Sequence, residues 1–197
     1  MAGKNRLATG NPSTRVVVGL GNAERQYQRT RHNVGARVVA EAISRLGLRP
    51  MPGLVAVPMS RSGFVLPDDY MNNSGLTVLK AVERWRPTAE GLLIVHDDLD
   101  LPLGEVRLRE GGGHGGHNGL RDVIQRLGSG AFRRLRIGIG RPPGAMDPAT
   151  YVLATFRPEE RQAIDLACQQ AADIVLNFVQ PPVAEVTVTA SRRPPPA

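Results

Sequence analysis

The segment GGGHGGHNG, Gly111 to Gly119, is the stretch around which the rest of the chain is organised. Glycine costs roughly 0.5–1 kcal/mol relative to alanine inside a helix or strand, so this run predicts backbone that turns sharply or approaches another group closely. Flexible linkers rarely contain histidine and asparagine between their glycines. The next apolar residues have the spacing of one helix face: Leu120, Val123, Ile124 and Leu127. We therefore expect a loop that leads into a helix N-terminus, where free N–H groups can bind an anion or a polarised carbonyl.

The overall composition indicates one globular domain with a basic surface. With 197 residues, 41% of them hydrophobic, the chain has enough apolar material for one core. A formal net charge of +7 is typical of proteins that bind polyanions, although solubility alone could also account for it. Aromatic residues make up only 4% of the chain, which favours backbone and shape contacts over base stacking in any nucleic-acid complex.

The sequence predicts a cytoplasmic protein with polar ends. Cys168 is the only cysteine, so it cannot form an internal disulfide, and this fits a reducing compartment. There is no apolar run of about 18 residues and no secretory leader, so we expect neither a membrane span nor export. Residues 1–14 and the proline-rich residues 180–197 are predicted to be disordered tails on either side of a domain spanning 15–179.

Strand-like and helix-like segments alternate along this domain. Strands are expected over 15–20, 91–95 and 134–142, short strands or an edge hairpin over 49–66, and an extended segment over 148–156. Helices are expected over 34–46, after a cap at Asn73 or Ser74, after the glycine-rich loop, and over 158–179. This alternation predicts an α/β fold: a single-domain three-layer sandwich with a mostly parallel mixed sheet and helices on both faces.

Polar residues follow the expected strands, at the edge where open α/β sheets hold their ligands. Asn22 follows the first strand, and His96 to Asp100 follow the strand over 91–95. Gly19-Leu20-Gly21 could begin a dinucleotide site, but Glu24 stands where the third glycine is needed and would repel a pyrophosphate. The segment from Asn22 to His32, the segment 96–100 and the loop 111–118 are therefore expected to share a cleft.

Two further patterns have more than one interpretation. A divalent metal could be bound by a set of His and Asp side chains, although no spacing in it defines a coordination geometry: His96, Asp97, Asp98, Asp100, His114 and His117. Arg107 and Arg109 alternate along a strand and so point to one face, which would suit either phosphate or solvent.

A set of motifs, taken in order, resembles the bacterial peptidyl-tRNA hydrolase family. These are VGLGN (18–22), TRHNVG (30–35), YMNNSG (70–75), HDDLDLPLG (96–104), GGGHGGHNGL (111–120) and RLRIGIGRP (134–142). The resemblance covers about residues 15–178. It implies a metal-independent, cofactor-free monomer that cleaves the ester joining a peptide to tRNA, and that contacts the CCA end and the acceptor stem.

The resemblance also implies roles for individual residues. His32 would be the general base that activates water, and Asp97 would orient it, which suits an imidazole that is largely neutral near pH 7. Substrate would be bound by Asn22, Tyr27, Tyr70, Asn72 and Asn118. The terminal phosphate of the tRNA would be held by Arg107 and Arg136, with the register between Arg134 and Arg136 left open.

The sequence departs from the family pattern at several positions. Ala23-Glu24 replaces the usual Pro-Gly after Asn22, Tyr70 replaces the commoner Phe, Ala154 replaces Gly, and the segment 49–66 is shorter than in many relatives. A non-catalytic RNA-binding module of the same fold is the alternative interpretation, because such a module needs only the basic face. The presence of Asn22, His32, Asp97 and Asn118 together favours an enzyme.

Overall fold

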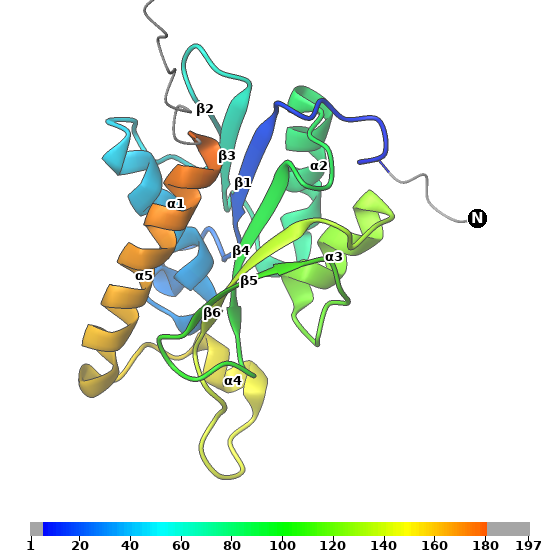
Figure 1. The fold of residues 1–197 in the computed structure, drawn as a ribbon. Coiled ribbons are helices and arrows are strands. Elements are labelled where there is room, and N and C mark those ends of the chain that lie inside the picture. The colour runs from blue at the N-terminus through cyan, green and yellow to red at the C-terminus, as the bar shows by residue number, and fades with distance from the viewer. Residues whose placement is uncertain (1–5, 181–197) are drawn as a thin grey trace, which may run out of the picture.

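The structure is a computed structural model that describes residues 6–180. Within these residues a six-stranded sheet forms the centre of the molecule, with the strand order β2-β3-β1-β4-β6-β5 (Figure 1). The strands are β1 (Arg15–Gly19), β2 (Gly53–Ala56), β3 (Ser62–Leu66), β4 (Leu92–Asp98), β5 (Val106–Glu110) and β6 (Arg133–Gly138). Strands β3, β1, β4 and β6 are parallel, whereas the edge strands β2 and β5 run antiparallel to their neighbours. The expected edge hairpin over 49–66 is formed by β2 and β3.

Helices cover both faces of the sheet, so the predicted α/β sandwich with a mostly parallel mixed sheet is confirmed (Figure 1). Helices α1 (Val34–Arg45) and α5 (Pro158–Val179) pack on one face, and α2 (Ser74–Trp85) and α3 (Asn118–Leu127) pack on the other. Helix α4 (Pro148–Leu153) and three short 3-10 turns lie in connections: η1 (Arg25–Tyr27), η2 (Arg31–Asn33) and η3 (Met71–Asn73).

The side chains of β4 alternate between the two cores. Leu93 and Val95 pack with α1 and α5, whereas Leu92 and Ile94 pack with α2 and α3. A strand that is buried on both faces is apolar throughout, which is why this segment is a continuous aliphatic run. Because side chains alternate along a strand, Asp97 at the end of β4 continues the α1 and α5 side.

Two local predictions were wrong. Residues 148–156 were expected to be extended, but 148–153 form α4, because Asp147 accepts a hydrogen bond from the N–H of Thr150 (3.0 Å) and Pro148 suits the first turn. Neither Asn73 nor Ser74 caps α2 with its side chain. The carboxylate of Asp122 on α3 instead accepts a hydrogen bond from the N–H of Gly75 (2.8 Å), so a neighbouring helix provides the cap.

The ends of the described chain extend the domain slightly. The predicted N-terminal tail of residues 1–14 does not hold for residues 6–14, because Leu7 is buried in the core beside α2 and α3 and Asn11 bridges to Pro87. Most of the predicted C-terminal tail, residues 181–197, lies outside the described residues. Among helices within 6–180, none combines the length and apolar character needed to cross a bilayer.

Candidate active site

A close contact between two backbone segments brings His32 to the end of β4. A Cβ atom on Gly35 would lie only 2.2 Å from the carbonyl oxygen of Val95, so only glycine allows η2 and α1 to approach the strand this closely. Nδ1 of His32 consequently lies 2.9 and 3.0 Å from the two carboxylate oxygens of Asp97. The sequence analysis expected this pairing, and the structure brings the two residues together.

His117 is a second histidine bonded to the same carboxylate, with its Nε2 3.0 Å from Oδ1 of Asp97. Its Nδ1 accepts a hydrogen bond from the N–H of Leu120 and so caps α3. Because Nδ1 is an acceptor, the ring proton must be on Nε2, which donates to Asp97. From the sequence, His117 is a candidate metal ligand only, and its contact with Asp97 is not predicted.

The two histidines stabilise the charge of Asp97. Burial alone would raise the pKa of this carboxyl group, but the interactions with His32 and His117 hold its pKa well below the ordinary value. Asp97 is therefore a carboxylate at neutral pH, and it accepts a hydrogen bond from each ring. His32 is left with Nε2 as its unprotonated nitrogen, the tautomer that a general base requires.

The glycine-rich loop lies beside this carboxylate. Gly111, Gly112, Gly115 and Gly116 have φ values between +55° and +119°, which residues with a side chain rarely adopt. The buried guanidinium of Arg134 donates hydrogen bonds to the carbonyl oxygens of Gly112, Gly113 and Gly130. Arg134 therefore fixes the backbone of the loop. The loop leads directly into the N-terminus of α3, as predicted.

His32 and Asp97 line a cavity of about 550 Å³. Its wall includes the expected site residues His32, Asp97, Asn118 and Arg136, together with His117, Arg109 and Arg141. His96 also lines it, but burial, followed by the neighbouring His117, lowers the pKa of His96 to about 3, so this imidazole is neutral. His32, the segment 96–100 and residues of the glycine-rich loop therefore meet in one cavity, whereas Asn22, which was expected in the same cleft, does not line it.

The remaining residues that were predicted to bind substrate do not line this cavity: Asn22, Tyr27, Tyr70 and Asn72. Asn22 is buried, and Asn33 holds its backbone through both N–H and carbonyl groups (3.0 and 2.8 Å). The Oδ1 atom of Asn22 accepts a hydrogen bond from the N–H of Met71 (2.8 Å), so Asn22 is linked to η3. Asn72, the next residue of η3, is exposed. Tyr27, at the end of η1, is half-buried.

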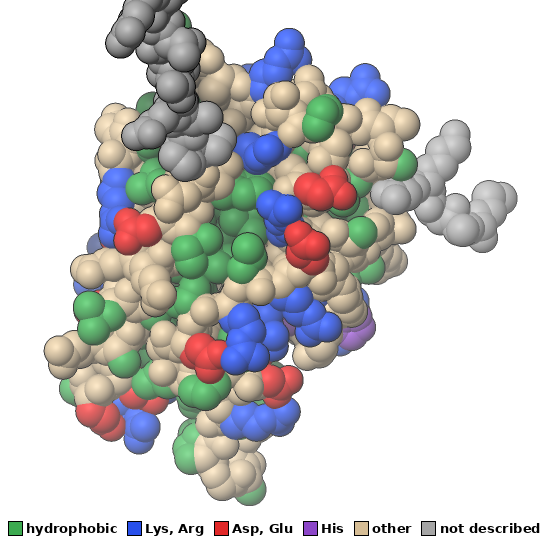
Figure 2. Space-filling model, in the orientation of Figure 1, with side chains coloured by type: hydrophobic (Ala, Val, Ile, Leu, Met, Phe, Trp, Pro, Cys, Tyr) green, Lys and Arg blue, Asp and Glu red, His purple; other side chains and the backbone are tan. Residues whose placement is uncertain are grey.

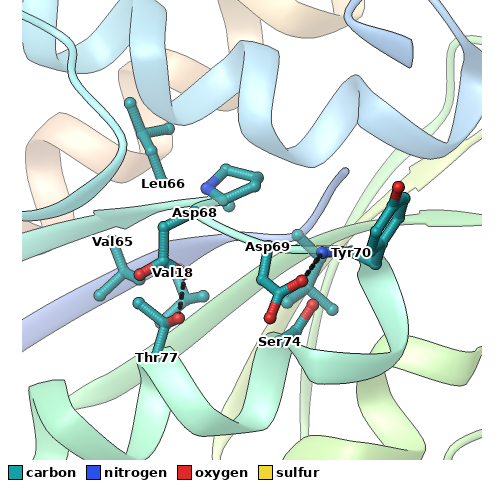
Figure 3. A pocket seen from close by; sticks show the side chains of 11 residues that line it. Val18, Val65, Leu66, Asp68, Asp69, Tyr70, Ser74 and Thr77 are labelled. Carbon is teal, nitrogen blue, oxygen red and sulfur yellow. Dashed lines mark hydrogen bonds between the residues drawn. The ribbon is translucent and has the colours of Figure 1, made fainter. Parts of the chain in front are cut away.

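Tyr70 and Glu24, two residues at which this sequence departs from the family pattern, contact each other. The hydroxyl of Tyr70 donates a hydrogen bond to Glu24, the residue that replaces the usual glycine. The hollow beside Tyr70 has a volume of only about 10 Å³, too small for a substrate group. Figure 3 shows that the ring of Tyr70 stands apart from the bonded pair Asp68 and Thr77 in this hollow.

Four arginines lie on the same face of β5 and β6, because they are directly opposite one another in the strand pairing: Arg107 with Arg136, and Arg109 with Arg134. Figure 2 shows Lys and Arg side chains gathered in the part of the molecule where these two strands lie. Arg109 and Arg136 line the cavity, whereas Arg107, which the sequence analysis had selected, does not and is paired with Glu105. Arg134 also lines the cavity, but it is buried under the loop, where its guanidinium donates hydrogen bonds to loop carbonyl oxygens. Arg109 was recognised as part of a basic face but not as a site residue.

Of the residues considered for the metal alternative, only Asp97 and His117 belong to a group within residues 6–180 whose ligand atoms lie close enough to share an ion, and its third member is His32. His32, Asp97 and His117 present ligand atoms within 4.8 Å of one another. The nitrogen to oxygen distances of about 3 Å in this group are those of hydrogen bonds.

Fold and site together define an α/β protein with a histidine–carboxylate centre suited to acid–base chemistry, in a cavity that is also lined by arginines. The family model for peptidyl-tRNA hydrolase matches residues 16–194. This chain belongs to the peptidyl-tRNA hydrolase family.

Individual relatives agree with this assignment. The peptidyl-tRNA hydrolase of Rhodococcus opacus is 43% identical over 179 residues, which covers 82% of this chain and 90% of the relative. The Mycobacterium ulcerans peptidyl-tRNA hydrolase is 45% identical over 166 residues, covering 80% and 87%. A crystal structure of peptidyl-tRNA hydrolase from Acinetobacter baumannii has a TM-score of 0.77 at 34% identity and covers 87% of this chain and 92% of that one.

Proposed function

We propose that this chain hydrolyses the ester between peptide and tRNA in peptidyl-tRNA, with His32 as the general base. The observation that carries this proposal is the buried carboxylate of Asp97, which occupies Nδ1 of His32 and leaves Nε2 to accept a proton from water. An aminoacyl ester is already activated, so a positioned water, a base and donors for the oxyanion are sufficient.

The reaction would proceed by attack of water on the ester carbonyl. Nε2 of His32 takes one proton from the water as its oxygen bonds to the carbonyl carbon, and Asp97 stabilises the imidazolium that forms. The tetrahedral intermediate then breaks its bond to the ribose oxygen, and the imidazolium returns the proton to that oxygen. The products are a free peptide and tRNA with an intact 3′ hydroxyl.

Amides would bind the parts of the substrate that every peptide shares. Because Oδ1 of Asn22 is occupied by Met71, the amide NH₂ of Asn22 is the group that can donate to a peptide carbonyl. Asn118 is the first residue of α3, so its side chain and the positive end of that helix can stabilise the oxyanion. Asn72, Tyr27 and Tyr70 are proposed to extend the peptide side of the site.

The terminal phosphate of the tRNA would be bound by Arg136 and Arg109. Both line the cavity, and the guanidinium of Arg109 has no hydrogen-bond or ion-pair partner among the described residues. Phosphate contacts position the nucleic acid without reading its sequence, as an enzyme that acts on many tRNAs requires. Arg107 has a weaker claim, because it lies outside the cavity and is neutralised by Glu105.

A single-turnover assay tests this function directly. Wild-type protein mixed in excess with N-acetylaminoacyl-tRNA should release N-acetylamino acid, and His32→Ala should lower the rate by about 10²–10⁴-fold while tRNA affinity is retained. Binding of intact substrate without cleavage over hours would instead indicate an RNA-binding module. Loss of turnover in EDTA, restored by a divalent ion, would favour the metal alternative at His32, Asp97 and His117.

Two properties of the wider context belong to the same proposal. The thiol of Cys168 is buried and free, and tRNA is made and used in the cytoplasm, so we expect a cytoplasmic enzyme. The cleft is built from elements of a single chain, so a monomer would be sufficient for activity. Light scattering during size-exclusion chromatography, combined with activity measured across the peak, would test the monomer.

A further inference from the structure

Asp98 and Arg136 form an ion pair on the wall of the catalytic cavity. Oδ2 of Asp98, at the end of β4, accepts a hydrogen bond of 2.6 Å from Nε of Arg136 on the neighbouring strand β6. Each of the two side chains is only 15% exposed. The other carboxylate oxygen, Oδ1, accepts a hydrogen bond from the N–H of Asp100 (2.8 Å). Both oxygens of Asp98 are therefore used, and the carboxylate is held in one orientation.

The contact uses only one edge of the guanidinium group. Arginine presents five N–H donors in a rigid planar fork, and here Asp98 binds through Nε. The edge formed by Nη1 and Nη2 points away from a group bound at Nε. It is this edge that matches two oxygens of a phosphate, because the fork can donate two parallel hydrogen bonds.

The other arginines near the cavity are held differently. Arg134 donates to the carbonyl oxygens of the glycine-rich loop and has a structural role. Arg141 pairs with Asp100 across a contact in which the side chains are 73% and 60% exposed, so water screens the pair. The pair of Asp98 and Arg136 combines a cavity position with shielding from solvent.

We propose that Asp98 is a positioning residue: it holds the guanidinium of Arg136 in the orientation that binds the 5′-terminal phosphate monoester of the tRNA. This inference rests on the proposed function. A terminal monoester carries nearly two negative charges and three free oxygens, whereas an internal diester carries one charge. An arginine that is held in a fixed orientation binds the terminal monoester more strongly than an internal diester.

A competing role for Asp98 would have the opposite effect. If its carboxylate occupied the place of the phosphate, removing it would strengthen tRNA binding. The geometry favours positioning, because the bond is made through Nε and the second oxygen is fixed by the backbone. Burial alone would raise the pKa of Asp98, but Arg136 and the N–H of Asp100 lower it, so the pair stays ionised at neutral pH.

The position of Asp98 also predicts which kinetic constant responds. Asp97 and Asp98 are neighbours on β4, one bonded to the catalytic histidine and the other to Arg136. The catalytic pair is therefore unchanged when Asp98 is replaced, and the loss should appear in KM. The value of kcat at saturating substrate should stay close to wild type.

The experiment compares N-acetylaminoacyl-tRNA carrying a 5′ phosphate with the same substrate after phosphatase treatment. We expect Asp98→Ala to lower kcat/KM for the phosphorylated substrate by about tenfold or more, with little change for the 5′-hydroxyl substrate. Asp98→Asn, which keeps the shape of the side chain, should show the same selective loss to a smaller degree. Asp98→Ala added to Arg136→Ala should cause no further loss, because the two residues act as a unit.

Glu105→Gln is the matched control, because it breaks the pair with Arg107 on the same face of the sheet but outside the cavity. It should keep the wild-type preference for phosphate. Tighter binding by Asp98→Ala, equal losses on both substrates, or additivity with Arg136→Ala would each overturn the proposal. A wild-type protein that cleaves both substrates equally well would refute the role of Asp98 alone, whereas one that cleaves neither would refute the proposed function.

Discussion

Arg107 and Arg136 lie directly opposite each other on β5 and β6, yet only Arg136 lines the catalytic cavity. Arg107 is 57% exposed at its side chain and is paired with Glu105. Arg109, two residues further along β5, is opposite Arg134 and does reach the cavity. Two residues of a strand span about 7 Å. This distance separates Arg109, which lines the cavity, from Arg107, which faces solvent.

The two arginines of β5 should therefore differ in their effect on tRNA binding. Arg109→Ala should weaken the binding of tRNA and reduce the slope of log K against log salt by about one, because one phosphate contact is lost. Arg107→Ala should change affinity by less than about threefold, the scale of an exposed pair. Filter binding over a salt series measures both. Equal losses from the two substitutions would place the RNA across the outer part of β5 instead.

The sequence predicts most of the fold because the fold rests on local patterns. The strand β4 is an aliphatic run because it is buried on both faces, and the bounds expected for the last helix, 158–179, agree with those of α5. The extended structure predicted over 148–156 was wrong because Asp147 caps a helix there, although Tyr151 and Val152 favour a strand. Local propensity is a weak guide where a cap decides the structure.

The catalytic site was only partly predictable, for a different reason. His32 and Asp97 could be paired through the family motifs, whereas the contact between His117 and Asp97 depends on how the glycine-rich loop folds back. The choice between Arg107 and Arg109 depends on the pairing register of an edge strand, which no local pattern specifies. The position of His117 directly before the first residue of α3 was the available signal, because that is where a cap is expected.

His117 has two separable roles, and replacing it with serine should separate them. His117→Ser keeps an oxygen that can cap α3, whereas His117→Ala does not, so the serine variant should be about 1 kcal/mol more stable than the alanine variant. Serine cannot reach Asp97, so both variants leave this buried carboxylate with one donor fewer, and kcat should fall by about tenfold in both.

Denaturant unfolding combined with single-turnover rates measures both effects of these substitutions. Unchanged kcat in His117→Ser would limit His117 to helix capping. A rate that recovers in His117→Gln, whose amide can donate toward Asp97, would support the role of the donor.

His96 should make the folded protein less stable as the pH falls. Burial, and after it the neighbouring His117, lowers the pKa of His96 in the fold to about 3, whereas the unfolded value is about 6.5. The unfolded chain therefore binds this proton first, so the contribution is complete above about pH 6.5 and declines as the pH drops toward 3. The expected slope is at most about 1.4 kcal/mol per pH unit.

The variant His96→Asn isolates this contribution, because its amide can still donate to the carbonyl oxygen of Asp97 in place of Nδ1 but does not titrate. Unfolding free energies measured between pH 6.5 and 4.5 should fall more steeply for wild type than for His96→Asn. This range lies above the region where the carboxyl groups of an unfolded chain titrate, so Asp97 adds little to the difference. Parallel curves for the two proteins would show that His96 can be protonated without opening the fold.

The buried pair of Arg31 and Glu160 should hold the catalytic histidine in place. Nη2 of Arg31 lies 2.6 Å from Oε2 of Glu160, and the two side chains are 3% and 8% exposed. The guanidinium also stacks over the rings of Tyr151 and Phe156, at 4.3 and 4.9 Å from their centroids. Because Arg31 precedes His32 in η2, this pair fixes the turn that carries the base against the start of α5.

Glu160→Ala leaves the positive charge of Arg31 buried without its partner, so we expect a loss of about 3–5 kcal/mol in stability. Arg157→Ala removes a cation that pairs with the same carboxylate but is 65% exposed, and should cost less than about 1 kcal/mol. Chemical denaturation measures both variants, and kcat measured well below the unfolding midpoint reports on His32. A stable Glu160→Ala protein with wild-type kcat would mean that the stacking on Tyr151 and Phe156 is enough to position the turn.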